Sequence, residues 1–382
     1  MKTLTLDYLP ESVRRKDGWL ITLIKRKFYA NFSNLEHGNI IFIDGDFTLQ
    51  CGNSAEPAAT VDVHDDRFYT TLAAGGAVGA SEAYMQGMWT CDQLTLLVQV
   101  LLRNTSVLRG LGNAAYKKPL YKLLHLMNRD SVHGSKKNIE AHYDLGNKLF
   151  ENFLDPTMTY SSGFFEKPDA TMQQASTAKL DRICQKLGLS ESDHVVEIGT
   201  GWGSFALHAA RNYNCKITTT TISEEQYQLA CQRVKDAGMQ DRIEIVKKDY
   251  RLLTGQYDKL VSIEMIEAVG LAYLGNYFEK CASLLKPAGK MLIQAITIAD
   301  QQYEFSKRNV DFIQRYIFPG GALPSVTALI NTATNKTDLR MTALEDITGH
   351  YATTMRKWRE KFYLNVEQIT ELGYDNRFLR MW

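Results

Sequence analysis

The stretch Val195–Gly203, with the sequence VVEIGTGWG, decides how the surrounding chain folds. Its apolar beginning predicts the end of a buried strand with Glu197 at the tip, and residues 204–213 after it have the apolar spacing of a helix. Between the two lie glycines at alternate positions, Gly199, Gly201 and Gly203. A strand, a glycine-rich turn and a helix form the first unit of a nucleotide-binding α/β sheet, because glycine lets the backbone come close to a ligand.

The glycine spacing is G-x-G-x-G. This spacing favours a loop for a smaller cofactor such as S-adenosylmethionine over the pyrophosphate loop of dinucleotide-binding proteins. Free N–H groups at the start of the following helix would complete such a cradle. A glycine-rich turn without a ligand is the alternative that this stretch alone leaves open.

The segments predicted to be further strands are 216–222, 243–247, 259–265 and 290–296. Because they alternate with helical segments, they predict a parallel, doubly wound α/β sheet. Ligands of such sheets bind at the carboxyl ends of the strands. The polar residues expected at those ends are Glu197, Thr221, Asp249, Glu264, Glu267 and Gln294.

Length and composition narrow the class of protein. The 382 residues are enough for two domains, and a net charge of +1 gives no whole-chain field that would attract nucleic acid. The six cysteines include no C-x-x-C pair, which favours reduced thiols in a cytoplasmic protein. No stretch reaches the ~18 apolar residues of a membrane span, so we expect any membrane contact to be peripheral, at the inner face of the membrane. No metal site is expected.

The residues before about 130 differ in character from the predicted sheet. The segment Trp19–Tyr29 is aromatic and basic, and residues 39–51 and 59–68 alternate as strands do. An aromatic, basic helix suits the surface of an anionic membrane. An ordinary core helix with a solvated basic edge is an equally good interpretation of the same residues.

Several stretches together resemble the cyclopropane-fatty-acid synthase family, whose members are S-adenosylmethionine-dependent methyltransferases. These stretches are EAHYDLGNKLFENFLDPTMTYSS, EIGTGWGSFALHAA, TISEEQ, EMIEAVG, YIFPGGALPS and HYATTMRKWREKF, and the resemblance runs from about Ala77 to Trp382. It implies a Rossmann-like class I methyltransferase domain over residues 131–382. Residues 1–130 resemble the extra domain of the bacterial members that act on membrane phospholipids, which implies a smaller α+β lipid- or membrane-binding domain with a linker. Relatives continue past the position of Trp382 through a helix and a strand, so we expect the chain to continue as well.

The resemblance also implies which residues contact S-adenosylmethionine. Glu197 would hold the amino end of the methionine moiety. The positions that match cofactor contacts in the family are Tyr160, Ser161, Glu197, Gly199, Gly201, Gly203, Thr221, Gln226 and Tyr250.

The family's active site holds a bicarbonate that acts as a base, and its usual ligands are a cysteine, a glutamate, a histidine, a tyrosine and a backbone group. Here the glutamate is Glu267, the tyrosine is Tyr351 and the backbone group belongs to Ile296. The sequence departs from the family at the other positions, with Ser162 in place of the cysteine, Gln294 in place of the histidine and Glu264 where a glycine is usual. Ser162 and Gln294 would still be able to bind bicarbonate through hydrogen bonds, and Glu264 is an alternative base.

These features together predict a C-methyltransferase that acts on the double bond of unsaturated acyl chains in membrane phospholipids and leaves a methyl-branched chain. Closure of a cyclopropane ring from the same carbocation is the close alternative, because the proton that is removed decides between the two products. N-methylation of a small amine and a catalytically dead lipid-binding module are further alternatives. The expected partners are unsaturated phospholipid chains and a second copy of the chain in a homodimer, with no nucleic acid.

Overall fold

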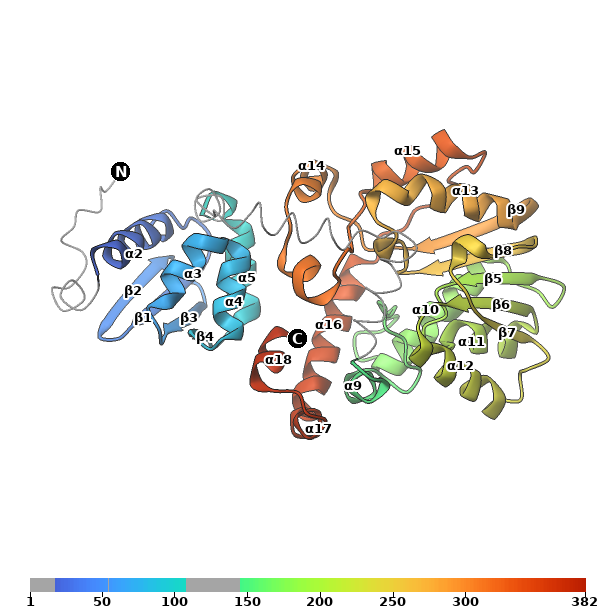
Figure 1. Cartoon of the computed structure of the whole chain (residues 1–382), viewed down its shortest axis with the longest axis horizontal. Helices are drawn as coiled ribbons and strands as arrows, with labels where there is room; N and C mark the ends of the chain where they lie inside the picture. Colours follow the sequence, from blue (N-terminus) through green and yellow to red (C-terminus); the bar gives the residue numbers. More distant parts are fainter. Residues whose placement is uncertain (1–17, 54, 108–144) are drawn as a thin grey trace. The chain divides into compact units, whose positions relative to one another are not determined.

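The computed structural model describes residues 18–53, 55–107 and 145–382 (Figure 1). These residues divide into two compact units. The first contains residues 18–107 together with 309–316 and 375–382, and the second contains residues 145–308 and 317–374. The predicted domain boundary between residues 130 and 131 lies outside the described residues. Among the described residues, no helix combines the length and the apolar character needed to cross a membrane.

The first unit is built on a mixed sheet with the strand order β2-β1-β3-β4. Its elements are α2 (Trp19–Phe32), β1 (Asn39–Asp44), β2 (Phe47–Gly52), β3 (Ala58–Val63), α3 (Arg67–Gly75), α4 (Ala77–Met85), β4 (Trp89–Cys91), α5 (Leu94–Arg103) and α18 (Asn376–Met381). Strands β1 and β3 run parallel, and the other two pairs run antiparallel. Gly45 has φ +59° in the tight turn between β1 and β2, a conformation that glycine adopts readily. The predicted alternating strands are therefore present, and helices accompany them as in an α+β domain.

Helix α2 contains the aromatic, basic segment and is partly buried and partly exposed. Its side chains Phe28, Tyr29 and Phe32 are buried in the aromatic core of the unit. Lys25 is also buried, with Nζ 3.1 Å from Asp44 and 2.7 Å from Asp66. The first turns stay open to solvent, with 80% of Trp19, 49% of Leu20 and 54% of Leu23 exposed. One face of α2 is thus a core helix, and Lys25 belongs to that face and not to a solvated basic edge.

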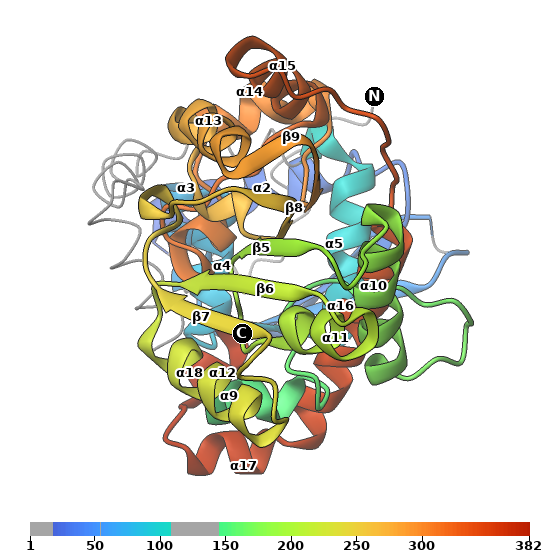
Figure 2. The same cartoon turned by 90° about the vertical axis from the view of Figure 1, so that its right-hand side faces the viewer.

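The second unit contains a parallel sheet with the strand order β7-β6-β5-β8-β9, seen side by side in Figure 2. The strands are β5 (His194–Ile198), β6 (Lys216–Thr221), β7 (Ile243–Lys247), β8 (Tyr257–Ile263) and β9 (Leu285–Gln294). All five predicted strands are confirmed, and so is the doubly wound α/β fold. Strand β9 begins at Leu285, earlier than predicted. The expected turn at residues 286–289 is an irregularity within the strand, where the pairing of β9 with β8 shifts in register between Tyr257 and Lys259.

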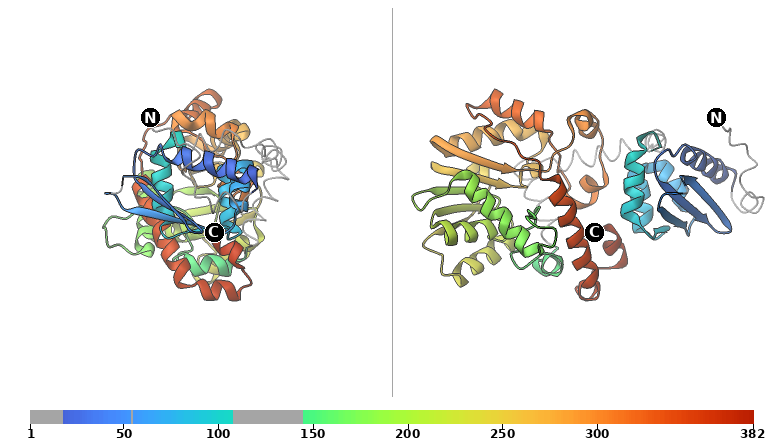
Figure 3. Two further views of the ribbon diagram at one scale, coloured as in Figure 1. Left: turned by 90° about the vertical axis from the view of Figure 1, so that its left-hand side faces the viewer. Right: turned by 180° about the vertical axis from the view of Figure 1, so that it is seen from behind.

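Helices cover both faces of this sheet (Figure 3). The helices of this unit are α9 (Asn147–Phe153), α10 (Met172–Leu187), α11 (Ser204–Tyr213), α12 (Glu224–Asp236), α13 (Leu274–Leu284), α14 (Asp300–Arg308), α15 (Val326–Lys336), α16 (Thr348–Leu364) and α17 (Val366–Glu371). Val195 of β5 packs in a cluster with residues of α10 and α11, whereas its neighbour Val196 packs in another cluster with residues of α13. Successive strand residues face opposite sides of a sheet, so the apolar run predicted for this strand is buried on both faces.

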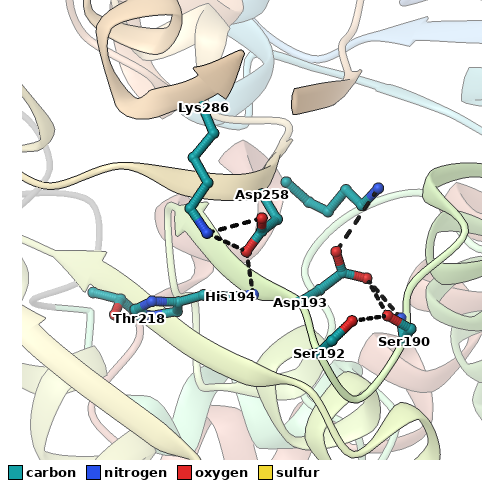
Figure 4. A network of polar contacts seen from close by, with 8 residues as sticks. Ser190, Ser192, Asp193, His194, Thr218, Asp258 and Lys286 are labelled. Carbon is teal, nitrogen blue, oxygen red and sulfur yellow. Dashed lines mark hydrogen bonds and ion pairs between the residues drawn. The ribbon is translucent and has the colours of Figure 1, made fainter. Parts of the chain in front are cut away.

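A polar network fixes the amino ends of the strands (Figure 4). Asp258 accepts hydrogen bonds from the backbone N–H of His194 and from Lys286, both at 2.9 Å. The ring of His194 lies 2.9 Å from the hydroxyl of Thr218. These contacts join β5, β6, β8 and the start of β9 at the edge opposite to their carboxyl ends, so they hold the sheet together without occupying the predicted ligand edge.

Candidate active site

The glycine loop after β5 has the geometry that its sequence predicts. Gly199, Gly201 and Gly203 have φ values of +98°, +52° and +85°, which side chains disfavour. The carbonyl oxygen of Thr220 accepts hydrogen bonds from the N–H groups of Gly199 and Thr200 at 3.1 and 2.9 Å, so β6 holds the loop in place. A Cβ atom on Gly201 would meet no atom of residues 18–53, 55–107 or 145–382 within 4 Å. With respect to these residues, the outer side of the loop is open space that a ligand can use.

Helix α11 begins directly after this loop, and no side chain caps its first turn. The free N–H groups and the positive end of the helix dipole attract a polar or negatively charged ligand group. Such groups are present in S-adenosylmethionine, which carries a carboxylate and ribose hydroxyls. The loop and the helix start therefore fit the predicted cofactor.

Glu197 and Lys179 are two buried ionisable residues that interact electrostatically with one another. Glu197 is 2% exposed and accepts a hydrogen bond of 2.6 Å from Thr219. Burial raises the pKa of Glu197 to about 8, while Thr219 and Lys179 act against the rise. Lys179 is 3% exposed, and burial lowers its pKa to about 8 against the opposing charges of Glu264, Glu197 and Asp155.

Lys179 is a residue of the site that the sequence motifs did not predict, and it donates a hydrogen bond of 2.7 Å to the hydroxyl of Ser161. A signal for it exists in the sequence, because Lys179 falls on the buried stripe of α10 between Ala175 and Ile183. A lysine at helical spacing within an apolar stripe is rarely buried without a partner of opposite charge.

The other predicted cofactor contacts lie at the carboxyl ends of β6 and β7 or in the loop before α10. Thr221 donates a hydrogen bond of 2.8 Å to Gln226, at the end of β6 and the start of α12. Tyr250 follows β7 in a short 3-10 turn, Tyr250–Leu252. The ring of Tyr160 packs against Phe150 and Trp358, with centroids 5.2 and 5.3 Å away. Their contacts with a cofactor stay a prediction.

Glu264 is the centre of the predicted catalytic residues. Its Oε1 accepts hydrogen bonds from the backbone N–H of Ser162 at 2.9 Å and from the side-chain amide of Gln294 at 2.8 Å. Its Oε2 accepts a hydrogen bond of 3.3 Å from the hydroxyl of Tyr351. Burial raises the pKa of the Glu264 carboxyl, and the donors together with the charge of Lys179 act against the rise. The structure thus joins Ser162, Gln294 and Tyr351 around one carboxylate.

Glu264 follows β8 with φ +47°, a left-handed conformation that is uncommon for a residue with a side chain. Its own N–H donates to the carbonyl oxygen of Gln294 at 2.8 Å and so fixes the backbone there. Unusual backbone conformations of this kind cluster at functional sites, where the surroundings hold them.

Glu267 lies one turn further, in the 3-10 turn Ile266–Ala268. Its Oε1 accepts a hydrogen bond from the backbone N–H of Ile296, the group that was predicted to bind a bicarbonate. Among the described residues, its buried Oε2 has no hydrogen-bond partner. Burial, with the charge of Glu264 as a second cause, raises the pKa of Glu267 to about 8. An oxygen in this condition is suited to a positive charge that arrives with a ligand.

Two predicted contacts differ from their expected form. The side-chain hydroxyl of Ser162 donates to the carbonyl oxygen of Gly163 at 3.0 Å, and only the backbone N–H of Ser162 faces the site. Three of the residues predicted to bind a bicarbonate, Ser162, Gln294 and Tyr351, donate hydrogen bonds to Glu264, and the backbone N–H of Ile296 donates to Glu267. The arrangement of donors therefore does not fit a bicarbonate, because these hydrogen bonds already go to carboxylates of the chain.

Comparisons with known proteins show which family and which enzymes the chain resembles. Residues 131–382 match the sequence profile described as mycolic acid cyclopropane synthetase. The chain is 38% identical, over 90% of its length and 81% of the relative, to the tuberculostearic acid methyltransferase UfaA1 of Mycobacterium tuberculosis. It is 34% identical, over 86% of its length and 83% of the relative, to the cyclopropane-fatty-acyl-phospholipid synthase of Escherichia coli. The crystal structure of the mycolic acid cyclopropane synthase CmaA1 with SAH and CTAB superposes with a TM-score of 0.60 at 30% identity, over 64% of this chain and 89% of that one.

Proposed function

Because the chain belongs to the mycolic acid cyclopropane synthetase family of S-adenosylmethionine-dependent methyltransferases, we propose that it methylates the double bond of unsaturated acyl chains in membrane phospholipids and leaves a methyl-branched chain. The observation that carries this proposal is the buried Oε2 of Glu267, which has no hydrogen-bond partner in the described part of the chain and interacts electrostatically with Glu264 and Tyr351. A methyl transfer to an alkene creates a positive charge in apolar surroundings, and this oxygen meets that need.

S-adenosylmethionine, when bound, supplies an electrophilic methyl group on a sulfonium. The glycine loop at residues 199–203 and the start of α11 would hold its methionine part, with Glu197 at the amino group. Thr221 and Gln226 at the end of β6 would bind the ribose, because hydroxyl and amide groups pair with ribose hydroxyls. Gly199 lies against Met265, where a Cβ atom would come within 3.3 Å of that side chain. The loop therefore adjoins the segment that carries Glu264 and Glu267.

An alkene is a weak nucleophile, so the chain has to hold it close to the methyl group and keep water away. We assign the holding of the acyl chain to the aromatic side chains around Tyr160, which include Phe153, Phe318 and Trp358. Glu267 stabilises the carbocation through its charge, and the ring faces of Tyr351 and Tyr160 stabilise it through their quadrupoles.

The fate of the carbocation decides the product. Loss of a proton from a neighbouring chain carbon gives a methyl-branched alkene, whereas loss from the new methyl group closes a cyclopropane ring. We favour the branched product because Ser162, Gln294 and Glu264 replace the residues of the usual base site. The name of the Mycobacterium tuberculosis relative supports this choice. Ring closure is the second candidate, since the Escherichia coli relative is named as a cyclopropane-fatty-acyl-phospholipid synthase.

The phospholipid substrate requires contact with a membrane surface, and we assign this contact to the first unit. The open turns of α2 present Trp19, Leu20 and Leu23, which suit insertion at the boundary between head groups and acyl chains. Arg26 and Lys27 follow on the same helix and would face anionic lipids. The protein would then act as a peripheral protein at the inner face of the membrane.

The test is mass spectrometry of phospholipids from cells that express the chain, with localisation of double bonds and branches. The expected result is an acyl chain heavier by one methyl-derived carbon, with a branch at the former double bond. An unchanged acyl composition, together with methylation of a small amine by the purified protein, would refute the proposal.

A further inference from the structure

We infer that the side chain of Glu264 takes the place of bicarbonate and is itself the proton acceptor of the reaction. This inference rests on the proposed function, because the proton comes from the carbocation formed there. It arises from a disagreement between the residues and the expected bicarbonate: the backbone N–H of Ser162 and the side chains of Gln294 and Tyr351 already donate hydrogen bonds to the carboxylate of Glu264.

The donors around Glu264 come from three separate parts of the second unit. Ser162 lies in the loop before α10, Gln294 ends β9, and Tyr351 lies in α16. A backbone N–H and a phenol each have a single hydrogen to donate. Since Ser162 and Tyr351 direct theirs to Glu264, a second anion would find these donors taken.

Electrostatic repulsion also disfavours a bicarbonate beside Glu264. A bicarbonate in this place would lie beside the carboxylate of Glu264, and like charges at short range disfavour one another. Glu264 needs no such neighbour, because it is tethered to the chain and is compensated by the ammonium group of Lys179. The left-handed backbone at Glu264 and its N–H bond to Gln294 keep the carboxylate aimed at its donors.

The two carboxylates have different surroundings and therefore different tasks. Glu264 accepts three hydrogen bonds from other residues, which favour its ionised form. Glu267 accepts one from Ile296, and its other oxygen has no partner among the described residues. Environments that separate two neighbouring carboxyl groups in this way assign the roles of base and electrostatic partner. We therefore assign the role of base to Glu264 and the role of electrostatic partner of the cation to Glu267.

The proton step balances without a further reactant. The electron pair of the double bond forms the new carbon–carbon bond to the transferred methyl group, the bond from that methyl group to sulfur breaks, and the neighbouring carbon of the acyl chain becomes the cation. A C–H bond next to that cation breaks, its electron pair forms the new double bond, and the proton forms an O–H bond on Glu264. After the product leaves, the Glu264 carboxyl releases the proton to water, and the hydrogen bonds from Ser162, Gln294 and Tyr351 form again.

The experiment compares the parent with Glu264→Gly and Glu264→Gln in a methylation assay on unsaturated phospholipid vesicles, in buffers freed of carbon dioxide or supplemented with sodium bicarbonate. Glycine accepts the left-handed backbone and empties the place of the carboxylate. Glutamine fills the same space without a base. We expect the parent to be indifferent to bicarbonate and both variants to lose about 10²–10⁴-fold in turnover without it, the range for one general base. Added bicarbonate should rescue Glu264→Gly and leave Glu264→Gln inactive.

Calorimetry with sodium bicarbonate gives a second readout that needs no lipid. Binding is expected to Glu264→Gly alone, while S-adenosylmethionine binds to the parent and both variants, which verifies their folding. Bicarbonate binding to the parent, parent turnover that requires bicarbonate, near-parental turnover of Glu264→Gln or failure of bicarbonate to bind Glu264→Gly would each overturn the inference. A parent that makes no methylated lipid but shows the expected binding pattern would refute the proposed function and leave Glu264 in the place of bicarbonate.

Discussion

The substitution Glu267→Gln tests the electrostatic part of the mechanism, because it keeps the shape of the side chain and removes its charge. Burial raises the pKa of Glu267 from its ordinary value of 4.5 to about 8. At about 1.4 kcal/mol per pH unit, this interval corresponds to a cost on the order of 5 kcal/mol for ionising Glu267 in the folded chain. A positive charge on the methyl donor and then on the acyl chain offsets that cost, so the carboxylate acts most strongly where the cation forms.

The expected result is a fall in turnover of about 10²–10³-fold, the scale for one preorganised electrostatic group, with unchanged affinity for S-adenosylmethionine. The pH dependence should change as well. In the parent, turnover rises as the pH approaches about 8 because Glu267 ionises there, and the variant loses this rise. The assay follows methyl transfer to unsaturated phospholipid vesicles across this pH range, with calorimetry of S-adenosylmethionine binding as the control.

Stability provides an independent check with a defined sign. The folded-state pKa of Glu267 lies above its unfolded value, so the folded chain holds the proton more tightly and loses stability as the pH rises from about 4.5 to about 8. The Gln variant lacks this loss and should become more stable than the parent in that window. Removal of one preorganised electrostatic group costs about 10²-fold or more in turnover. If the turnover of Glu267→Gln stayed within a factor of about two of the parent, Glu267 would have no part in the mechanism.

The remaining predictions concern other parts of the chain. Gly201→Val should abolish S-adenosylmethionine binding in calorimetry, because the valine side chain would enter the open side of the loop at φ +52°. Circular dichroism should show that the fold is retained. An affinity equal to that of the parent would contradict the cofactor assignment. Tyr351→Phe should lower turnover less than Glu267→Gln, since the ring face remains, and an equal loss would assign the main effect to its hydroxyl. In flotation assays, the parent should bind anionic vesicles more strongly than neutral ones, and added salt should weaken its binding to anionic vesicles. The double variant Trp19→Ala, Leu23→Ala should bind both kinds of vesicle more weakly than the parent. Equal binding by parent and variant would exclude α2 from the membrane contact.

The parallel sheet is predictable from sequence because its strands are local, apolar and β-branched. Segments such as 243–247 alternate with helices, and this alternation permits few arrangements. The end of a strand is harder to predict. Strand β9 continues through Lys286 and Gly289, where the turn residues form an irregularity of the strand and not its boundary, because pairing with β8 resumes at Lys259 and Lys290.

The residues of the candidate site are predictable as a set, whereas their partners are not. The sequence places Glu264 at the end of a strand, but its φ of +47° and its three donors depend on segments far apart in the chain. Lys179 and Lys25 were missed as buried charges for the same reason, since Ser161 and Asp44 reach them only in the folded state. The observed site therefore differs from the predicted one mainly in its long-range hydrogen bonds and ion pairs.

The most direct test of the central claim uses S-adenosylmethionine with a fully deuterated methyl group, purified protein and vesicles of an unsaturated phospholipid. Mass spectrometry then locates the label in the product. We expect the label to appear as a branch on the acyl chain at the former double bond. The branch should keep every deuterium of the methyl group, because the proton is lost from a chain carbon. A ring carbon that has lost one deuterium, or an acyl chain without label, would contradict it.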